Sequence, residues 1–428
     1  MNDFDKNTVQ ASPYGHTTDV TSSDNPFIVK KQPKQCRDPL FAVLLYANVA
    51  AIIAVFYKYG LPALNDAMNA EDAQADAKAD EDAIDIDSAA IVKVAIGTAA
   101  VATVLSGITM QILMCIPGIL IKAAVIFNVI VSLVVAVYGF MSGSMIIGII
   151  GLIFFALMLC YAKMIWSRIP FATANLKTGC AAVRANCGVT LFAYIFTALS
   201  IGWVVMWSLA VAGIKDTALN CVADENGNEA CKPNYGILFV LFVSYFFTNQ
   251  VLMNCVHVTV AGVVGSWWFN PKQSGFCGSA VCGSFVRTMT TSFGSICFGS
   301  LLVAIIQAVR QLTEMARQND EIGNMLACCI DCILGILESL LEYFNKWAFV
   351  YVGLYGFGYC EAGKSVMTLF KDRGWEAIIA DDLVGMVLFM MSLIVGLITG
   401  GIGVVFVTAT DWFANTADEN LAKIIAFV

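Results

Sequence analysis

The chain has 428 residues, of which 59% are hydrophobic and only 13% are charged, whereas about a quarter of the residues in a soluble domain are charged. A soluble fold of this size cannot bury so much apolar surface, but a bilayer solvates it. The net charge of −8 is concentrated between Glu71 and Asp87, and no basic stripe with interleaved aromatic residues indicates nucleic-acid binding. The composition therefore predicts one polytopic membrane domain rather than a soluble or nucleic-acid-binding protein.

The first 39 residues form a polar tail, and basic residues lie at its end, just before the first apolar run: Lys30, Lys31, Lys34 and Arg37. A cleavable signal peptide would place its apolar stretch nearer the N-terminus. Because Lys and Arg are retained on the cytosolic side of a membrane, we expect residues 1–39 to be a cytosolic tail and residues 40–428 to be the membrane domain.

Apolar runs of membrane-spanning length predict the spans, since about 20 apolar residues cross the hydrocarbon core. The expected fold is an all-α polytopic integral membrane helical bundle with about nine complete spans and the start of a tenth. The expected complete spans are 40–59, 89–113, 116–138, 143–165, 188–213, 236–268, 284–310, 346–370 and 383–409.

Two polar loops are expected on the outer side. Residues 62–88 form an acidic loop between the first two spans, and residues 215–235 form a second loop that holds Cys221 and Cys231. Basic residues after spans four and eight give the same orientation as the tail. If the second loop faces an oxidising compartment, its two cysteines form a disulfide; the alternative is two free thiols.

The stretch 313–345 mixes acidic and basic residues with apolar ones. Counting crossings places it outside. Its cysteines, Cys328, Cys329 and Cys332, would equally suit palmitoylation of an amphipathic helix on the inner surface, and a neighbouring span would then have to be re-entrant.

Span six carries the clearest polar strip. Gln250, Asn254 and His257 recur at helical spacing, so their side chains share one face, and polar groups inside a span face an aqueous path or a partner helix. We expect a water-filled cavity to reach this face. An imidazole titrates near neutral pH and could carry a proton; the alternative is a buried histidine satisfied by a neighbouring carbonyl. On span seven, Thr288, Ser292, Ser295 and Gly299 form a stripe of small residues, which favours close helix packing.

Several segments, in order along nearly the whole chain, resemble the choline transporter-like family. They are Cys36-Arg37-Asp38, Arg168 to Ala172, Asn254 to Gly262 followed by Trp267 and Trp268, Ser292 to Ser300, Asn345 with Ala348 and Tyr355-Gly356, and Asp381-Asp382-Leu383. The short first outer loop is similar to that of the fungal-type members. The resemblance implies a plasma-membrane solute carrier for choline or a related small amine, with proton exchange proposed for some members; for the fungal-type branch a choline substrate is less secure.

A choline site is expected to use aromatic faces, because a quaternary ammonium has no hydrogen to donate. The candidates are Trp203 and Trp207 on span five and Tyr355 and Tyr359 on span eight, each pair one turn apart; the alternative for both pairs is packing or an interfacial belt. Glu361 could supply a counter-charge, or it could pair with Lys364.

Motifs for catalysis are missing from the sequence, which has no His-Glu-x-x-His zinc motif, Walker loop or Gly-x-Ser-x-Gly elbow. We therefore expect neither an enzyme, nor a cofactor, nor a metal site. The main alternative to a carrier is a non-transporting membrane scaffold or lipid-handling protein.

The last residues, Leu421 to Val428, become apolar again after a polar loop. Eight residues cannot cross a bilayer. The sequence therefore predicts the beginning of a tenth span and an incomplete gene product that lacks the rest of that span and the acidic tail of the family.

Overall fold

The computed structural model describes residues 35–65, 88–143, 145–214, 221–223, 229–231, 233–318, 324–373 and 375–409. Most of the predicted N-terminal tail, most of the acidic loop 62–88 and the apolar end Leu421 to Val428 lie outside these described residues. The predictions made for those three segments are therefore not tested by the structure.

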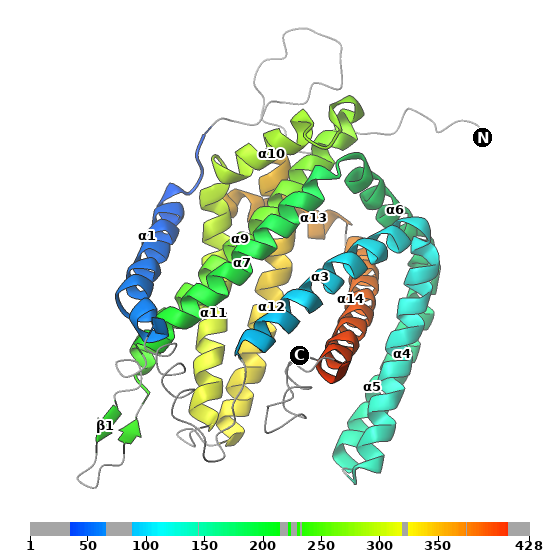
Figure 1. Ribbon diagram of the computed structural model, residues 1–428. Helices are drawn as coiled ribbons and strands as arrows, with labels where there is room; N and C mark the ends of the chain where they lie inside the picture. The colour runs from blue at the N-terminus through cyan, green and yellow to red at the C-terminus, as the bar shows by residue number, and fades with distance from the viewer. Residues whose placement is uncertain are drawn as a thin grey trace, which may run out of the picture. The chain divides into compact units, whose positions relative to one another are not determined.

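Helices make up nearly all of the described chain, and most of them are long (Figure 1). In chain order they are α1 (Pro39–Val55), which continues as η1 (Phe56–Gly60), α3 (Ser88–Cys115), α4 (Pro117–Met141), α5 (Met145–Ile165), η2 (Trp166–Arg168), α6 (Ile169–Ala185), α7 (Gly188–Gly213), α9 (Tyr235–Phe269), η3 (Pro271–Gln273), α10 (Ser279–Met289), α11 (Phe293–Gln318), α12 (Asn324–Tyr355), α13 (Tyr359–Arg373) and α14 (Trp375–Ala409). Between α7 and α9, the short strands β1 (Cys221–Ala223) and β2 (Glu229–Cys231) pair antiparallel.

Among the described residues, eight helical segments are long and apolar enough to cross a membrane. Their outer faces are apolar too: on α5, the side chains of Ile146, Ile153 and Phe154 are more than half exposed. An apolar surface of this extent is rare on a soluble monomer, and lipid tails cover it at no cost. The chain is therefore an all-α polytopic membrane protein, as predicted.

The long helices run between two sides of the bundle, while the shorter α6, α10 and α13 lie at the side where α1 begins (Figure 1). We call the side on which α1 begins the N side, and the side that carries the β1–β2 pair the hairpin side. A Cβ at Gly213, the last residue of α7, would overlap the backbone of Tyr59, so α7 and η1 end together on the hairpin side. On the N side, Arg37 N–H donates to the carbonyl of Thr291, 3.0 Å away, just before α11.

The prediction of one span at 346–370 is wrong. The chain breaks at Gly356–Gly358, where Gly356 has φ = 69° and its N–H donates to the carbonyl of Val352, as a left-handed glycine does at a helix C-terminus. α12 therefore runs from Asn324 to Tyr355, and its 32 residues span about 48 Å. We count α12 as the ninth crossing, although its charged side chains keep it out of the eight most apolar segments.

The stretch 313–345 is accordingly part of two spans. It forms the end of α11 and most of α12, which lie side by side (Figure 1). The span predicted at 284–310 begins later, at Phe293, because residues 290–292 separate it from α10. Thr288 therefore lies on α10, while Ser295 and Gly299 lie on α11.

Buried side chains form two main apolar clusters. The larger one joins α1, α7, α9, α11, α12 and α13 around residues such as Phe247, Ile296 and Phe349. The second joins α3 to α6 with α14, around Ile121, Ile165 and Leu383. We call these the main cluster and the α14 cluster.

Candidate functional site

The central element of the site is α9, which makes interhelical hydrogen bonds to four other helices. Asn48 on α1 donates to Thr248 Oγ1 at 3.1 Å, and Ser200 on α7 donates to Asn249 Oδ1. The contacts to α11 and α12 come from the polar strip that the sequence predicts. Because lipid tails accept no hydrogen bonds, polar groups in a span find partners on neighbouring helices.

Each residue of the predicted strip has a partner. Gln250 Nε2 donates to Gln307 Oε1 on α11 at 3.3 Å, and Asn254 Nδ2 donates to Ser300 Oγ at 3.0 Å. His257 Nε2 lies 3.1 Å from the carbonyl oxygen of Lys346 on α12. The histidine thus has the neighbouring carbonyl that the alternative interpretation expected, and all three side chains stay half-buried.

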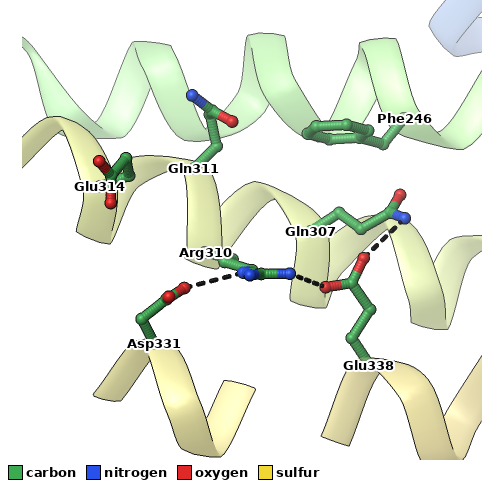
Figure 2. Close-up of a pocket in the computed structure, with 7 residues that line it drawn as sticks. All are labelled: Phe246, Gln307, Arg310, Gln311, Glu314, Asp331 and Glu338. Atoms are coloured by element: carbon green, nitrogen blue, oxygen red, sulfur yellow. Dashed lines mark hydrogen bonds and ion pairs between the residues drawn. The ribbon is translucent and has the colours of Figure 1, made fainter. Parts of the chain in front are cut away.

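A pocket of about 330 Å³ lies between α9, α11 and α12, near the end of α11 and the beginning of α12; Figure 2 shows its lining side chains. The side chains that line it are Phe246, Gln307, Arg310, Gln311, Glu314, Asp331 and Glu338. We expected a cavity at the polar face of α9. The pocket reaches Gln307, which is the hydrogen-bond partner of Gln250, but Asn254 and His257 are not among its lining residues.

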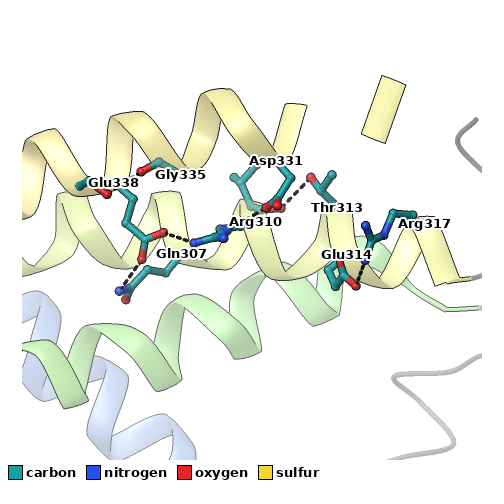
Figure 3. Close-up of polar contacts among 10 residues, drawn as sticks. Gln307, Arg310, Thr313, Glu314, Arg317, Asp331, Gly335 and Glu338 are labelled. Carbon is teal, nitrogen blue, oxygen red and sulfur yellow. Dashed lines mark hydrogen bonds and ion pairs between the residues drawn. The ribbon is translucent and has the colours of Figure 1, made fainter. Parts of the chain in front are cut away.

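Arg310 lies between two carboxylates in this pocket (Figure 3). Its Nε is 2.8 Å from Asp331 Oδ1, and its second guanidinium contact is 3.0 Å, to Glu338 Oε2. Nearer the end of α11, Arg317 pairs with Glu314 at 2.5 Å. The pocket therefore holds one more acidic group, Asp331 or Glu338, than these two arginines neutralise.

Gln307 connects the pocket to the strip on α9. It accepts the hydrogen bond from Gln250, and its Nε2 donates to Glu338 Oε1 at 2.9 Å and to Glu342 Oε1 at 3.2 Å. One chain of polar contacts thus leads from Arg310 in the pocket through Gln307 to α9, and the strip continues along α9 to His257.

The tryptophan pair is oriented by the backbone of α9. Trp203 Nε1 donates to the carbonyl of Tyr245 at 3.3 Å, and Trp207 Nε1 donates to that of Leu241 at 3.1 Å. Trp203 is only 5% exposed. These contacts support the alternative interpretation, in which the tryptophan pair packs against α9. Neither ring lines the pocket.

The tyrosine pair does not share a helix, so that part of the prediction is wrong. Tyr355 is the last residue of α12 and is 49% exposed, whereas Tyr359 is the first of α13 and is buried. The Tyr359 hydroxyl donates to Asn345 Oδ1. Glu361, in the first turn of α13, is exposed, and none of the ion pairs among the described side chains joins it to Lys364.

Lys346 connects α12 with α14. Its Nζ lies 2.6 Å from Asp381 Oδ1 on α14, and the next residue, Asp382, accepts a hydrogen bond from the Tyr161 hydroxyl on α5. A charged side chain within a span is costly unless it has a partner of opposite charge. The roles of Arg310, Gln307 and Lys346 were not predicted, although the charges at helical spacing within 313–345 were a signal that two helices face each other there.

The fold and the site define a polytopic membrane protein whose helices are joined by polar side chains beside an apolar core. Residues 149–428 match the family described as "Plasma-membrane choline transporter". The chain is similar to Protein PNS1 of Gibberella zeae, with 35% identity over 290 residues, covering 65% of this chain and 53% of the relative. It is also similar to Protein PNS1 of Eremothecium gossypii, with 32% identity, covering 72% and 58%, and to a CTL-like protein of Dictyostelium discoideum, with 30% identity, covering 62% and 47%.

The chain belongs to the choline transporter-like family. It spans about half the length of the curated relatives that it matches. The family resemblance inferred from the sequence motifs is confirmed, and membership favours a membrane transporter over an enzyme.

Proposed function

We propose that this protein is a carrier that moves choline or a related small amine across the plasma membrane, with proton exchange, and that its N-terminus is cytosolic. The observation that carries the proposal is the set of polar side chains between the helices. Hydrogen bonds lead from the acidic pocket through Gln307 to Gln250, and Asn254 and His257 follow on the same face of α9. Such a route through a helical bundle is typical of a substrate or ion pathway.

The pocket has the chemistry of a first binding site for a cation. Its volume of about 330 Å³ is at the lower end of the range for small-molecule sites. Asp331 and Glu338 attract positive charge, and Phe246 offers an aromatic face (Figure 2), which is worth about 1–2 kcal/mol to a desolvated ammonium. On the proposed orientation this pocket opens to the outside.

The strip on α9 supplies the next set of contacts. The amides of Gln250 and Asn254 can exchange their hydrogen bonds with Gln307 and Ser300 for bonds to the hydroxyl of choline. His257 is the proposed proton carrier, because an imidazole can gain or lose a proton near neutral pH, and its contact with the Lys346 carbonyl suits the protonated and the neutral ring alike.

Uptake of labelled choline into proteoliposomes tests the proposal, with and without an imposed pH gradient. We expect uptake above that of protein-free vesicles. Uptake should be faster when the inside of the vesicles is more acidic than the outside, because protons then leave as choline enters. Glu338→Gln should raise the KM for choline, because it removes a carboxylate from the pocket. Asp372→Asn makes the same change of charge at an exposed position on α13 and serves as the control.

No uptake above protein-free vesicles would refute the carrier and favour the scaffold or lipid-handling alternative. Equal KM values for Glu338→Gln and Asp372→Asn would refute the pocket as the first site.

A further inference from the structure

We infer that Asp38 is a positioning residue that clamps α1, α11 and α13 together on the N side, and that release of its carboxylate lets α1 move away from α13. Asp38 Oδ2 accepts hydrogen bonds from Ser295 Oγ on α11 at 2.7 Å and from the backbone N–H of Tyr359, the first residue of α13, at 3.0 Å. One carboxylate oxygen thus joins the beginnings of three helices.

Asp38 stands at the N-cap position of α1, where an aspartate ordinarily accepts a hydrogen bond from the first turn of its own helix. Here it makes no such bond. It instead caps α13, whose own N-cap position is occupied by Gly358, a residue with no side chain to offer. The carboxylate also lies at the positive end of the α13 dipole, which stabilises it there.

The backbone at Asp38 is held in an uncommon conformation. Its φ of 50° is the only positive φ of a non-glycine residue in the described part of the chain, and such a conformation is strained and persists only where surrounding contacts require it. Gly294 supplies one of these contacts, since a Cβ there would overlap the carbonyl oxygens of Arg37 and Asp38. The residues just before α1 therefore lie close against α11. This contact depends on the positive φ of Asp38 and on the missing side chain of Gly294.

The clamp is connected to the middle of the main cluster. Tyr359 donates its hydroxyl to Asn345 Oδ1, and Asn345 Nδ2 donates to the carbonyl of Gly299 at 2.9 Å. The position that Asp38 gives to the start of α13 thus fixes a buried contact between α12 and α11.

Away from Asp38, the start of α1 is held by apolar contacts such as the stacked rings of Phe41 and Phe298, with centroids 4.1 Å apart. The next side-chain hydrogen bond of α1 comes from Asn48, which donates to Thr248 on α9. Loss of the Asp38 side-chain bonds therefore loosens the first turn of α1 from the start of α13. The backbone bond from Arg37 to Thr291 and the side chain of Asn48 still tie α1 to α11 and α9. That this movement opens the N side during transport rests on the proposed function; the clamp itself rests on the geometry.

Two substitutions distinguish the effect of the Asp38 carboxylate from the effect of its backbone conformation. Asp38→Gly keeps a residue that accepts positive φ without strain but removes both hydrogen bonds, whereas Asp38→Asn tolerates the same conformation and keeps an acceptor oxygen. Hydrogen exchange of the complete protein in detergent should be faster, on the order of fivefold, at residues 359–362 in Asp38→Gly than in Asp38→Asn. Exchange in α14, at residues 383–395, is the control and should be unchanged.

Alkylation by a water-soluble maleimide gives a second measurement. Cys297, two residues after Ser295, is fully buried in the main cluster, and Cys180 is buried in the α14 cluster. We expect several-fold faster labelling of Cys297 in Asp38→Gly than in Asp38→Asn, with Cys180 unchanged.

Equal exchange and labelling in the two variants would overturn the clamp, and so would a uniform increase that includes α14 and Cys180, since that is the result of general destabilisation. If the unsubstituted protein takes up no choline while these local differences hold, the proposed function fails and the clamp stands.

Discussion

Gly299 on α11 lies where three helices meet, and its replacement by alanine should destabilise the protein. A Cβ at this position would lie 2.5 Å from Tyr359 Cε2 and 2.7 Å from Phe349 Cζ, both inside ordinary van der Waals contact. Neither ring can move aside easily. Phe349 is 1% exposed, and Tyr359 is held by its hydrogen bond to Asn345.

The magnitude follows from two opposing effects. Overpacking of a buried site costs about 1–3 kcal/mol, while alanine is favoured over glycine inside a helix by about 0.8–1 kcal/mol. Because both neighbouring rings are fixed, we place Gly299→Ala in the upper half of the first range, which leaves a net loss of about 1–2 kcal/mol in the free energy of unfolding.

Unfolding by SDS in mixed micelles, followed by circular dichroism, measures this loss. Gly396→Ala is the matched control, because Gly396 lies inside α14 and a Cβ there meets no atom within 4 Å. We expect the control to be neutral or slightly stabilised. If the two variants unfold at the same SDS fraction, the close packing of α11 against Tyr359 and Phe349 is not as described.

Three further predictions concern the disulfide, the histidine and the tryptophan pair. Cys221 and Cys231 should be linked, because β1 and β2 place them directly opposite each other, at a separation that suits a disulfide; mass spectrometry of non-reduced peptides checks this, and alkylation of both thiols without reductant would contradict it. Replacing His257 with Gln should flatten the pH dependence of choline uptake and leave the amount of folded protein unchanged, so an unaltered pH profile would rule out this histidine as the proton carrier. Trp207→Phe removes the bond to the Leu241 carbonyl and should cost about 0.6–1.7 kcal/mol of stability without altering the KM for choline; a raised KM with unchanged stability would place this ring in the substrate site instead.

Sequence patterns predicted the spans wherever the apolar run was uninterrupted. The boundaries of α4, α5, α7 and α14 lie within a few residues of the predictions except at the start of α14, since the number of apolar residues needed to cross a bilayer is set by its thickness. The prediction for the eighth span was wrong because its first half carries Asp331, Glu338 and Glu342. A hydropathy pattern counts such residues as exposed, and it contains no information that Arg310 and Gln307 on α11 are their partners.

The site was predictable to the extent that it depends on one helix. Helical spacing correctly grouped Gln250, Asn254 and His257 on one face of α9, because that periodicity is local. The pocket depends on which helix packs against α9, and nothing local specifies that contact. Likewise, Tyr355 and Tyr359 have the spacing of one helical turn, but Gly356 takes a positive φ between them and ends α12.

The composition of the α14 cluster has a consequence for synthesis. Its buried residues come from two distant parts of the chain, the last of the early ones being Cys180 and the first of the late ones Leu383. At about 5–20 residues per second, the ribosome needs on the order of 10–40 s to synthesise the roughly 200 residues between them. During that time α3 to α6 are inserted but have no α14 to pack against, and the hydroxyl of Tyr161 lacks Asp382, its partner in the folded protein. The early helices therefore wait without their partner until α14 is synthesised, so a substitution on the buried face of α14 should expose the first half of the protein to membrane quality control.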